Sequence, residues 1–251
     1  MKKLYDKSKI GFAVLWIIFY CVLMSVGDAL SARIGVDKSV TLAIGVVLSA
    51  ILLLFLKKNS LLSDYGLCKP GTSARSMLYY IPVFAMLTAN LWYGVTLNVG
   101  APEAVLYILT MLCVGFLEEI IFRGLLFEAM KKDSVKTAIL VSSVTFGIGH
   151  IINLINGSGA DLISNLLQVV YATAAGFMFV MMYYKSKSLW VCMAAHGAFN
   201  ALGLFTDETN VTKEGQILSA LFLTAITGFY ALYLALSMKG KTGKQGSPRN
   251  G

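Results

Sequence analysis

Residues 115–124 read GFLEEIIFRG, which places two adjacent carboxylates and an arginine inside an apolar run long enough to cross a bilayer. Ionisable residues within membrane helices are costly and usually functional, so this cluster is expected to have a role. On an α-helix Glu119 and Arg123 lie at i and i+4 on one face, where they can pair. Glu118 points roughly 100° away from Glu119. We therefore predict that Glu119 and Arg123 form a supporting ion pair and that Glu118 is available for chemistry.

The composition around this stretch excludes an ordinary soluble domain, because 57% of the 251 residues are hydrophobic and only 14% are charged. The apolar residues form long blocks separated by short polar connections, which is typical of a polytopic helical membrane protein. We predict an all-α fold in one integral membrane domain, 1–251, with a basic disordered tail over about 239–251. About eight transmembrane helices are expected, over residues 10–27, 39–56, 77–97, 103–130, 136–155, 162–184, 188–205 and 216–238.

The charges predict how these helices are oriented. The net charge is +8, but the basic residues lie between the apolar blocks rather than on one amphipathic face, so nucleic acid is not an expected partner. Apart from Arg123, the termini and the even-numbered connections hold 17 Lys and Arg, whereas the odd-numbered connections hold only Arg33, Lys38 and Lys213. The positive-inside rule therefore predicts a multi-pass protein of the cell membrane with both termini in the cytoplasm.

Both histidines of the chain lie within apolar blocks. His150 ends the segment FGIGH (146–150) in the fifth block, and His196 begins HGAFN (196–200) in the seventh. His196 and Asn200 are four residues apart and share a helix face. A single His or Asn in a membrane helix is often only an interhelical hydrogen-bonding residue. Together, however, the fourth, fifth and seventh blocks can bring Glu118, Glu119, His150, His196 and Asn200 to one polar cavity.

This set of side chains suits hydrolysis. A buried carboxylate beside an imidazole can take a proton from water, and the second imidazole and the Asn200 amide can stabilise an oxyanion. The alternative is a zinc ion held by Glu118, His150 and His196 with an open water position. No HExxH motif is present, and the spacing does not separate the two mechanisms.

The three motifs EExxxR (118–123), FxxxH (146–150) and HxxxN (196–200) resemble, in order and on successive membrane helices, those of the CPBP family. This family comprises CAAX prenyl endopeptidases and bacteriocin-processing enzymes, and is also called the Abi family. The resemblance covers about residues 103–205, the core of the family.

The resemblance implies an intramembrane protease whose cavity faces the cytoplasm. By analogy with the family, Glu118 and His150 would activate water, and His196 and Asn200 would form the oxyanion site. Glu119 and Arg123 would support this geometry. Members are often labelled metalloproteases, but the CAAX branch implies a metal-independent glutamate mechanism, so no cofactor is expected and Zn²⁺ is the alternative.

The predicted function is an endopeptidase that cleaves membrane-associated peptides or proteins: CAAX-like tails, leader peptides or membrane-bound regulators. One alternative is a non-catalytic immunity or scaffold protein that keeps the cavity without using it. Another is a transporter that uses Glu118, His150 and His196, although no inverted repeat or pair of broken helices supports it. The pattern leaves the substrate, the oligomeric state and the role of the connection 57–76 open.

Overall fold

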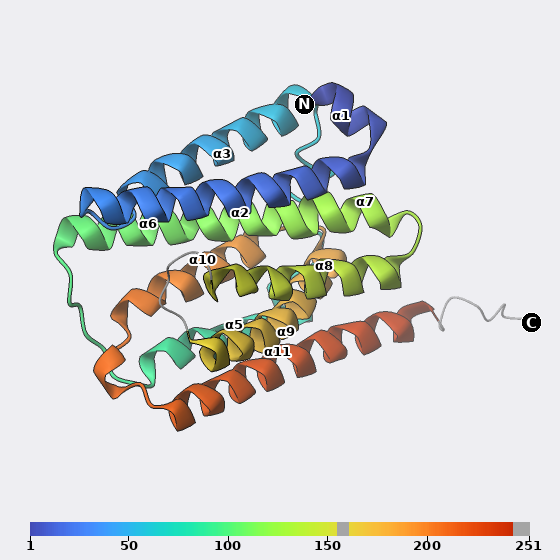
Figure 1. The fold of residues 1–251 in the computed structure, drawn as a ribbon. Coiled ribbons are helices and arrows are strands. Elements are labelled where there is room, and N and C mark those ends of the chain that lie inside the picture. Colours follow the sequence, from blue (N-terminus) through green and yellow to red (C-terminus); the bar gives the residue numbers. More distant parts are fainter. Residues whose placement is uncertain (155–160, 243–251) are drawn as a thin grey trace, which may run out of the picture.

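The computed structural model describes residues 1–154 and 161–242, and its regular elements are helices, as Figure 1 shows. Within those residues there is no β-strand, only an isolated bridge between Val95 and Thr206. The α-helices are α1 (Lys2–Lys7), α2 (Lys9–Ile34), α3 (Ser39–Lys58), α4 (Ala74–Met77), α5 (Tyr80–Thr88), α6 (Ala101–Glu118), α7 (Glu128–Lys131), α8 (Val135–Gly149), α9 (Leu162–Ser186), α10 (Trp190–Leu202) and α11 (Lys213–Thr242). A π-helical segment, η2 (Glu119–Phe127), joins α6 to α7, and short 3₁₀ turns follow α5 (Ala89–Leu91), α8 (His150–Leu154) and α10 (Gly203–Phe205) and precede α11 (Glu208–Asn210).

The all-α membrane fold is confirmed, but two of the eight predicted spans are short. Six helical segments are long and apolar enough to cross a membrane: Lys9–Ile34, Ser39–Lys58, Ala101–Lys131, Val135–Leu154, Leu162–Ser186 and Lys213–Met238. The third and seventh blocks form shorter apolar helices, Tyr80–Leu91 and Trp190–Phe205. A full span needs about 20 residues at 1.5 Å each. The third block falls short because the chain leaves the helix before Gly94, which has φ +99°.

The first four residues of the predicted disordered tail are helical instead. Helix α11 continues to Thr242, so residues 239–242 are helical. The remaining tail, 243–251, and the last residue of the predicted fifth block, 155, lie outside the described residues.

Side chains at the helix ends explain several of the boundaries. Ser8 caps α2 by accepting from the Gly11 N–H, and Ser134 caps α8 by accepting from the Thr137 N–H. Helix α2 ends at Gly35, whose φ of +79° lies in the left-handed region that glycine adopts without strain. These signals set where the long spans start and stop.

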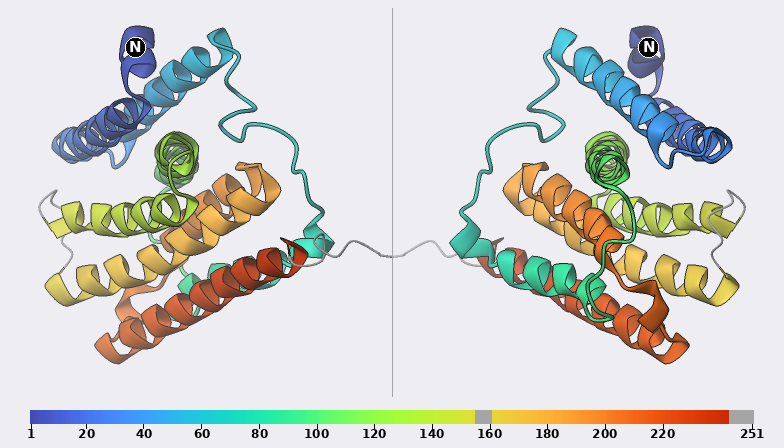
Figure 2. Two further views of the ribbon diagram at one scale, coloured as in Figure 1. Left: turned by 90° about the vertical axis from the view of Figure 1, so that its right-hand side faces the viewer. Right: turned by 90° about the vertical axis from the view of Figure 1, so that its left-hand side faces the viewer.

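The long segment of α6, η2 and α7 lies at the centre of the bundle. In Figures 1 and 2 the α2–α3 hairpin packs on one side of it, and α8, α9 and α11 form layers on the other. Helix α10 packs closely on α6. Only glycine fits at position 115, since an added Cβ would lie 2.6 Å from the backbone N of Gly197. This close approach places the motif residues of α6 and α10 next to each other.

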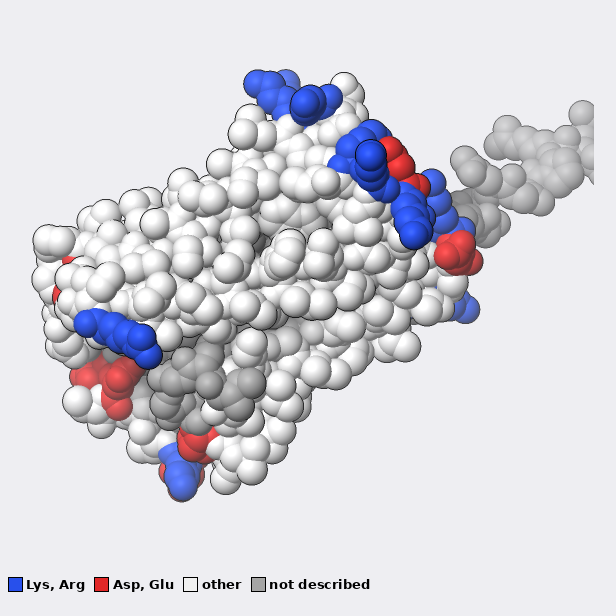
Figure 3. Space-filling model, turned by 45° about the horizontal axis from the view of Figure 1, so that its top comes forward, with Lys and Arg blue, Asp and Glu red and all other residues white. Residues whose placement is uncertain are grey.

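The surface is apolar except at the two ends of the bundle. Large hydrophobic side chains face outward along the helices, with Phe84 70% and Phe229 72% exposed. Figure 3 shows a broad uncharged surface between two ends that carry the charges, with most of the Lys and Arg at one of them. We call this the basic end; it holds Lys2 and the connections 59–73, 132–134 and 187–189. The hairpin end holds the connections 35–38 and 92–100 and residues 203–212.

Candidate active site

The motif that begins at Glu118 lies where the central helix changes from α to π geometry. Glu118 ends α6, and all nine residues of η2 from Glu119 onward are buried. π-helical segments are rare and frequently occur at functional sites. The sequence pattern predicted an ordinary α-helix here, because the residue types of this stretch do not distinguish the two geometries.

Glu119 and Arg123 form the predicted pair in a fully buried setting. An N–H of the Arg123 guanidinium donates to Oε1 of Glu119 at 3.0 Å, and both side chains have no exposed surface. The guanidinium lies 4.1 Å from the centre of the Phe146 ring, a distance typical of a cation–π contact. The pair is therefore enclosed by protein on every side.

His196 connects this pair to Glu118. Its Nδ1 lies 3.0 Å from Oε1 of Glu119, and its Nε2 lies 3.5 Å from Oε2 of Glu118. A carboxylate only accepts hydrogen bonds, so Nδ1 carries the proton in that contact. The imidazole also stacks on Phe179, with 5.6 Å between ring centres. Glu119 thus orients the ring so that its second nitrogen faces Glu118.

Glu118 has a further partner that the sequence pattern did not suggest. The hydroxyl of Tyr20, on α2, donates to Oε1 of Glu118 at 2.6 Å. The two residues are 98 positions apart, and α2 contains none of the three motifs. One tyrosine in an apolar block gives no signal of such a contact.

His150 begins the 3₁₀ turn that follows α8. Its Nδ1 lies 3.0 Å from the carbonyl oxygen of Phe146, one helical turn earlier. Because a carbonyl only accepts, Nδ1 donates here, and in the neutral ring Nε2 keeps its lone pair. The amide of Asn165 donates to the His150 carbonyl at 2.8 Å and holds the turn against α9. His150 is therefore set up as a hydrogen-bond acceptor or base.

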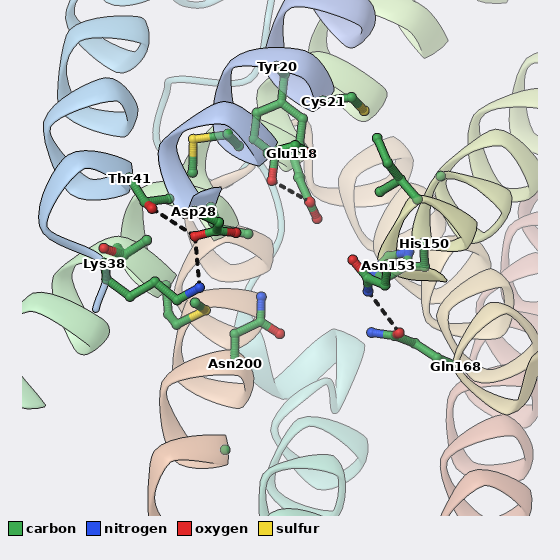
Figure 4. Close-up of a pocket in the computed structure, with 18 of the residues that line it drawn as sticks. Tyr20, Cys21, Asp28, Lys38, Thr41, Glu118, His150, Asn153, Gln168 and Asn200 are labelled. Atoms are coloured by element: carbon green, nitrogen blue, oxygen red, sulfur yellow. Dashed lines mark hydrogen bonds and ion pairs between the residues drawn. The ribbon is translucent and has the colours of Figure 1, made fainter. Parts of the chain in front are cut away.

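Glu118, His150 and Asn200 line one cavity of about 410 Å³, and Figure 4 shows them reaching it from different helices. This volume lies within the range of small-ligand sites. His196 does not line this cavity. It lines a second cavity of about 40 Å³ together with His150 and Asn200. The structure thus brings together the predicted site residues, with Glu119 and Arg123 on the buried side and Glu118, His150 and Asn200 on the open side.

The larger cavity also holds polar residues outside the three motifs. Lys38 donates to Oδ1 of Asp28 at 2.9 Å, and the Asn153 amide donates to Gln168 at 3.0 Å. Figure 4 shows both pairs around the cavity. They come from four different elements, which is why no local spacing predicted them.

A metal centre at this site has no assembled donor set. Within residues 1–154 and 161–242, no three His, Cys, Asp or Glu side chains are grouped as metal ligands. The alternative zinc set of Glu118, His150 and His196 is therefore not preformed. Both ring nitrogens of His196 face carboxylates, Nδ1 at 3.0 Å from Glu119 and Nε2 at 3.5 Å from Glu118.

Comparisons with known proteins agree with the motifs. Residues 100–202, which contain all three, match the family described as type II CAAX prenyl endopeptidase Rce1-like. A Bacillus subtilis (strain 168) protein named "Putative membrane peptidase YdiL" is 41% identical over 116 residues. That match covers 43% of this chain and 42% of the relative, so the chain shares less than half of the relative's length. Over the helices that carry the three motifs, the chain is similar to the Rce1-like family of CAAX prenyl endopeptidases.

Proposed function

We propose that the protein is an intramembrane endopeptidase that cleaves peptide segments of membrane-associated substrates with water activated by Glu118 and His150. One observation carries this proposal: Glu118 and His150, from separate membrane helices, line the same cavity, and His196 contacts Glu118 from behind. Such ionisable groups are costly in an apolar bundle, and a purely structural role explains Glu118 poorly because it faces the cavity. The family match over residues 100–202 and the relative's name point to the same class of activity.

In the proposed reaction, Glu118 takes a proton from a water molecule in the cavity while the lone pair of His150 Nε2 orients that water. The water oxygen then bonds to the carbonyl carbon of the scissile peptide. The Tyr20 hydroxyl donates to one oxygen of the Glu118 carboxylate, and Nε2 of His196 lies 3.5 Å from the other. Protonated Glu118 next donates to the amide nitrogen, the C–N bond breaks, and the products are a carboxylate and an amine.

We propose that the Asn200 amide stabilises the oxyanion, with His196 beside it as a positioning residue. Both lie on α10 and line the 40 Å³ cavity with His150. That space exceeds the roughly 10–15 Å³ that a single water requires, so an oxygen atom fits there. The Asn200 amide supplies neutral N–H donors, which are typical of oxyanion sites. Glu119 and Arg123 keep His196 in place.

We further propose that the reaction requires no metal, since the same residues supply both the base and the donors. A chelator strong enough to strip zinc is then expected to leave the cleavage rate unchanged. A loss of activity that added Zn²⁺ restores would instead support the set of Glu118, His150 and His196 as ligands.

The test of the function compares wild type with Glu118→Gln in the native host, by mass spectrometry of peptides in medium and membrane fractions. One or a few peptides or processed proteins are expected to disappear in the variant, because the amide cannot accept a proton from water. Glu128→Gln is the matched control. Glu128 lies on α7 of the same span, bonded to Lys131 and Tyr183 and outside the cavity.

The control is expected to leave the peptides unchanged, and both variants are expected to reach the membrane at the wild-type level. If Glu118→Gln gives the wild-type profile, the protein does not act as a protease under those conditions. A binding role, such as that of an immunity or scaffold protein, then becomes the better account of the cavity.

A further inference from the structure

The 410 Å³ cavity extends from the site toward only one end of the bundle. Glu118 is its deepest carboxylate, ~25 Å along α6 from Ala101 at 1.5 Å per residue. From there the lining continues to Tyr107, near the start of α6, to Lys38 in the α2–α3 turn and to Gly203 after α10. Lys38 and Gly203 belong to the hairpin end, and Tyr107 lies about two helical turns from it. In the described part of the chain, no lining residue comes from the connections at the basic end.

The side chains at the hairpin-end mouth of the cavity are polar and partly exposed. The Lys38 and Asp28 side chains that meet there are 18% and 32% exposed, whereas Glu118 is 13% exposed. Asp28 also accepts from the Thr41 hydroxyl at 2.7 Å. The exposure therefore rises from the site toward the hairpin end, as expected for an entry route from that side.

The charges assign this end to the outside of the cell. By sequence, the odd-numbered connections hold only Arg33, Lys38 and Lys213, against 17 Lys and Arg in the termini and the even-numbered connections, which include those of the basic end. Figure 3 shows the same asymmetry on the surface of the molecule. Cytoplasmic connections are those enriched in Lys and Arg, so the basic end belongs in the cytoplasm.

We infer that the site is reached from the extracytoplasmic side and that its substrate is an extended peptide segment exposed at the outer surface of the membrane. This inference rests on the proposed peptidase function. It favours leader peptides of exported chains and outer segments of membrane proteins over CAAX-like tails, which belong to cytoplasmic proteins. It also opposes the cytoplasm-facing cavity that the family resemblance implies. The cavity extends toward the hairpin end, and the charges place the opposite, basic end in the cytoplasm. If the basic end is cytoplasmic, the cavity therefore cannot open to the cytoplasm.

Cysteine accessibility tests the route without any need for catalysis. Cys21 lines the cavity beside Tyr20, and it becomes the only cysteine when Cys68, Cys113 and Cys192 are replaced by alanine. Two reporters in a cysteine-free chain mark the ends. Asp37→Cys lies in the exposed turn of the hairpin end, and Asp64→Cys lies in an exposed connection of the basic end.

Intact cells are treated with a charged, membrane-impermeant methanethiosulfonate, and unreacted thiols are then counted by a gel shift after denaturation. We expect Asp37→Cys and Cys21 to be modified in intact cells, and Asp64→Cys only after permeabilisation. Modification of Asp64→Cys but not Asp37→Cys in intact cells would overturn the orientation. With Asp37→Cys outside, a Cys21 that reacts only after permeabilisation, or not at all, would overturn the route.

The same labelling in a Glu118→Gln background separates this inference from the proposed function, because accessibility does not depend on cleavage. If the labelling fails while peptides still disappear in Glu118→Gln, the enzyme stands and the outer route is wrong. If the labelling succeeds while the peptides are unchanged, the cavity opens outward but is not a protease site. Alanine variants that do not reach the membrane are replaced by serine variants of the same three cysteines.

Discussion

Glu118 and Glu119 are neighbours in the chain, yet they belong to two different regions of the molecule. Glu119 lies in a sealed region with Arg123 and His196, and its side chain has no exposed surface. Glu118 lies at the edge of an open region, the 410 Å³ cavity, and its side chain is 13% exposed. The difference teaches that the chemistry of a carboxylate here is decided by what surrounds it. The sealed region supports the geometry, and the open region can receive a substrate.

The largest expected effect separates the two carboxylates by activity. With a substrate identified, Glu118→Gln is expected to lower kcat/KM by ~10²–10⁴, the usual contribution of a general base. Its thermal unfolding midpoint in detergent is expected to stay at the wild-type value, because Glu118 is not part of the enclosed ion pair. A variant that loses stability in proportion to activity would show that Glu118 belongs to the structural region.

The next effect concerns the sealed region and is measured as stability. Arg123→Met leaves the Glu119 carboxylate buried without its cation, and breaking a buried pair typically costs about 3–5 kcal/mol. We expect a lower unfolding midpoint in detergent and less protein in the membrane. The control is the double variant Glu119→Gln/Arg123→Met, which leaves no unpaired charge and should recover much of the loss. Equal stability of Arg123→Met and wild type would contradict a structural role for the pair.

A smaller effect tests how the two regions are joined through α2. Tyr20→Phe removes a hydrogen bond to a carboxylate, and bonds to charged groups contribute about 1.5–3 kcal/mol. If Tyr20 positions Glu118, kcat should fall while KM changes little, and the unfolding midpoint should fall no more than in a variant that loses an equivalent bond away from the cavity. Tyr183→Phe is the matched control, since the Tyr183 hydroxyl donates to Glu128 at 2.8 Å, away from the cavity. Equal kcat values for the two variants would remove Tyr20 from the machinery.

The smallest expected effect tests the contact between α6 and α10. A Cβ at Gly115 would lie 2.6 Å from the backbone N of Gly197, so Gly115→Ala must push the two helices apart. Overpacking of this kind costs about 1–3 kcal/mol. It should also lower activity, because Gly197 follows His196 directly. Gly228→Ala is the control, with nothing within 4 Å of its added Cβ, and should match wild type in both the unfolding midpoint and kcat/KM.

The helical membrane fold could be predicted from the sequence because the bilayer imposes simple rules. Long apolar blocks must be helices, since no water is present to satisfy the backbone. The pairing of Glu119 with Arg123 followed from their spacing on one face and is present at 3.0 Å. The shortness of α5 and α10 was not predicted, because hydropathy does not distinguish a spanning helix from one that stops within the bundle.

The details of the site could not be read from the chain for a related reason. The Tyr20–Glu118 bond joins residues 98 positions apart, and the position of His196 between the two carboxylates depends on how closely α10 approaches α6. Such contacts arise from packing between helices, which local periodicity does not record. The direction of the cavity is of the same kind, since it depends on which helix ends remain apart.

By itself, therefore, the sequence determined a polytopic helical membrane protein, the charge difference between its two ends, and the residues that we propose for its chemistry. Each of these follows from local rules of hydropathy, charge and spacing that act on one helix at a time. Only the tertiary structure decided which carboxylate is sealed, which faces the cavity, and toward which end that cavity opens. These properties depend on the distances and rotations between helices, which are set by the packing of side chains from distant parts of the chain.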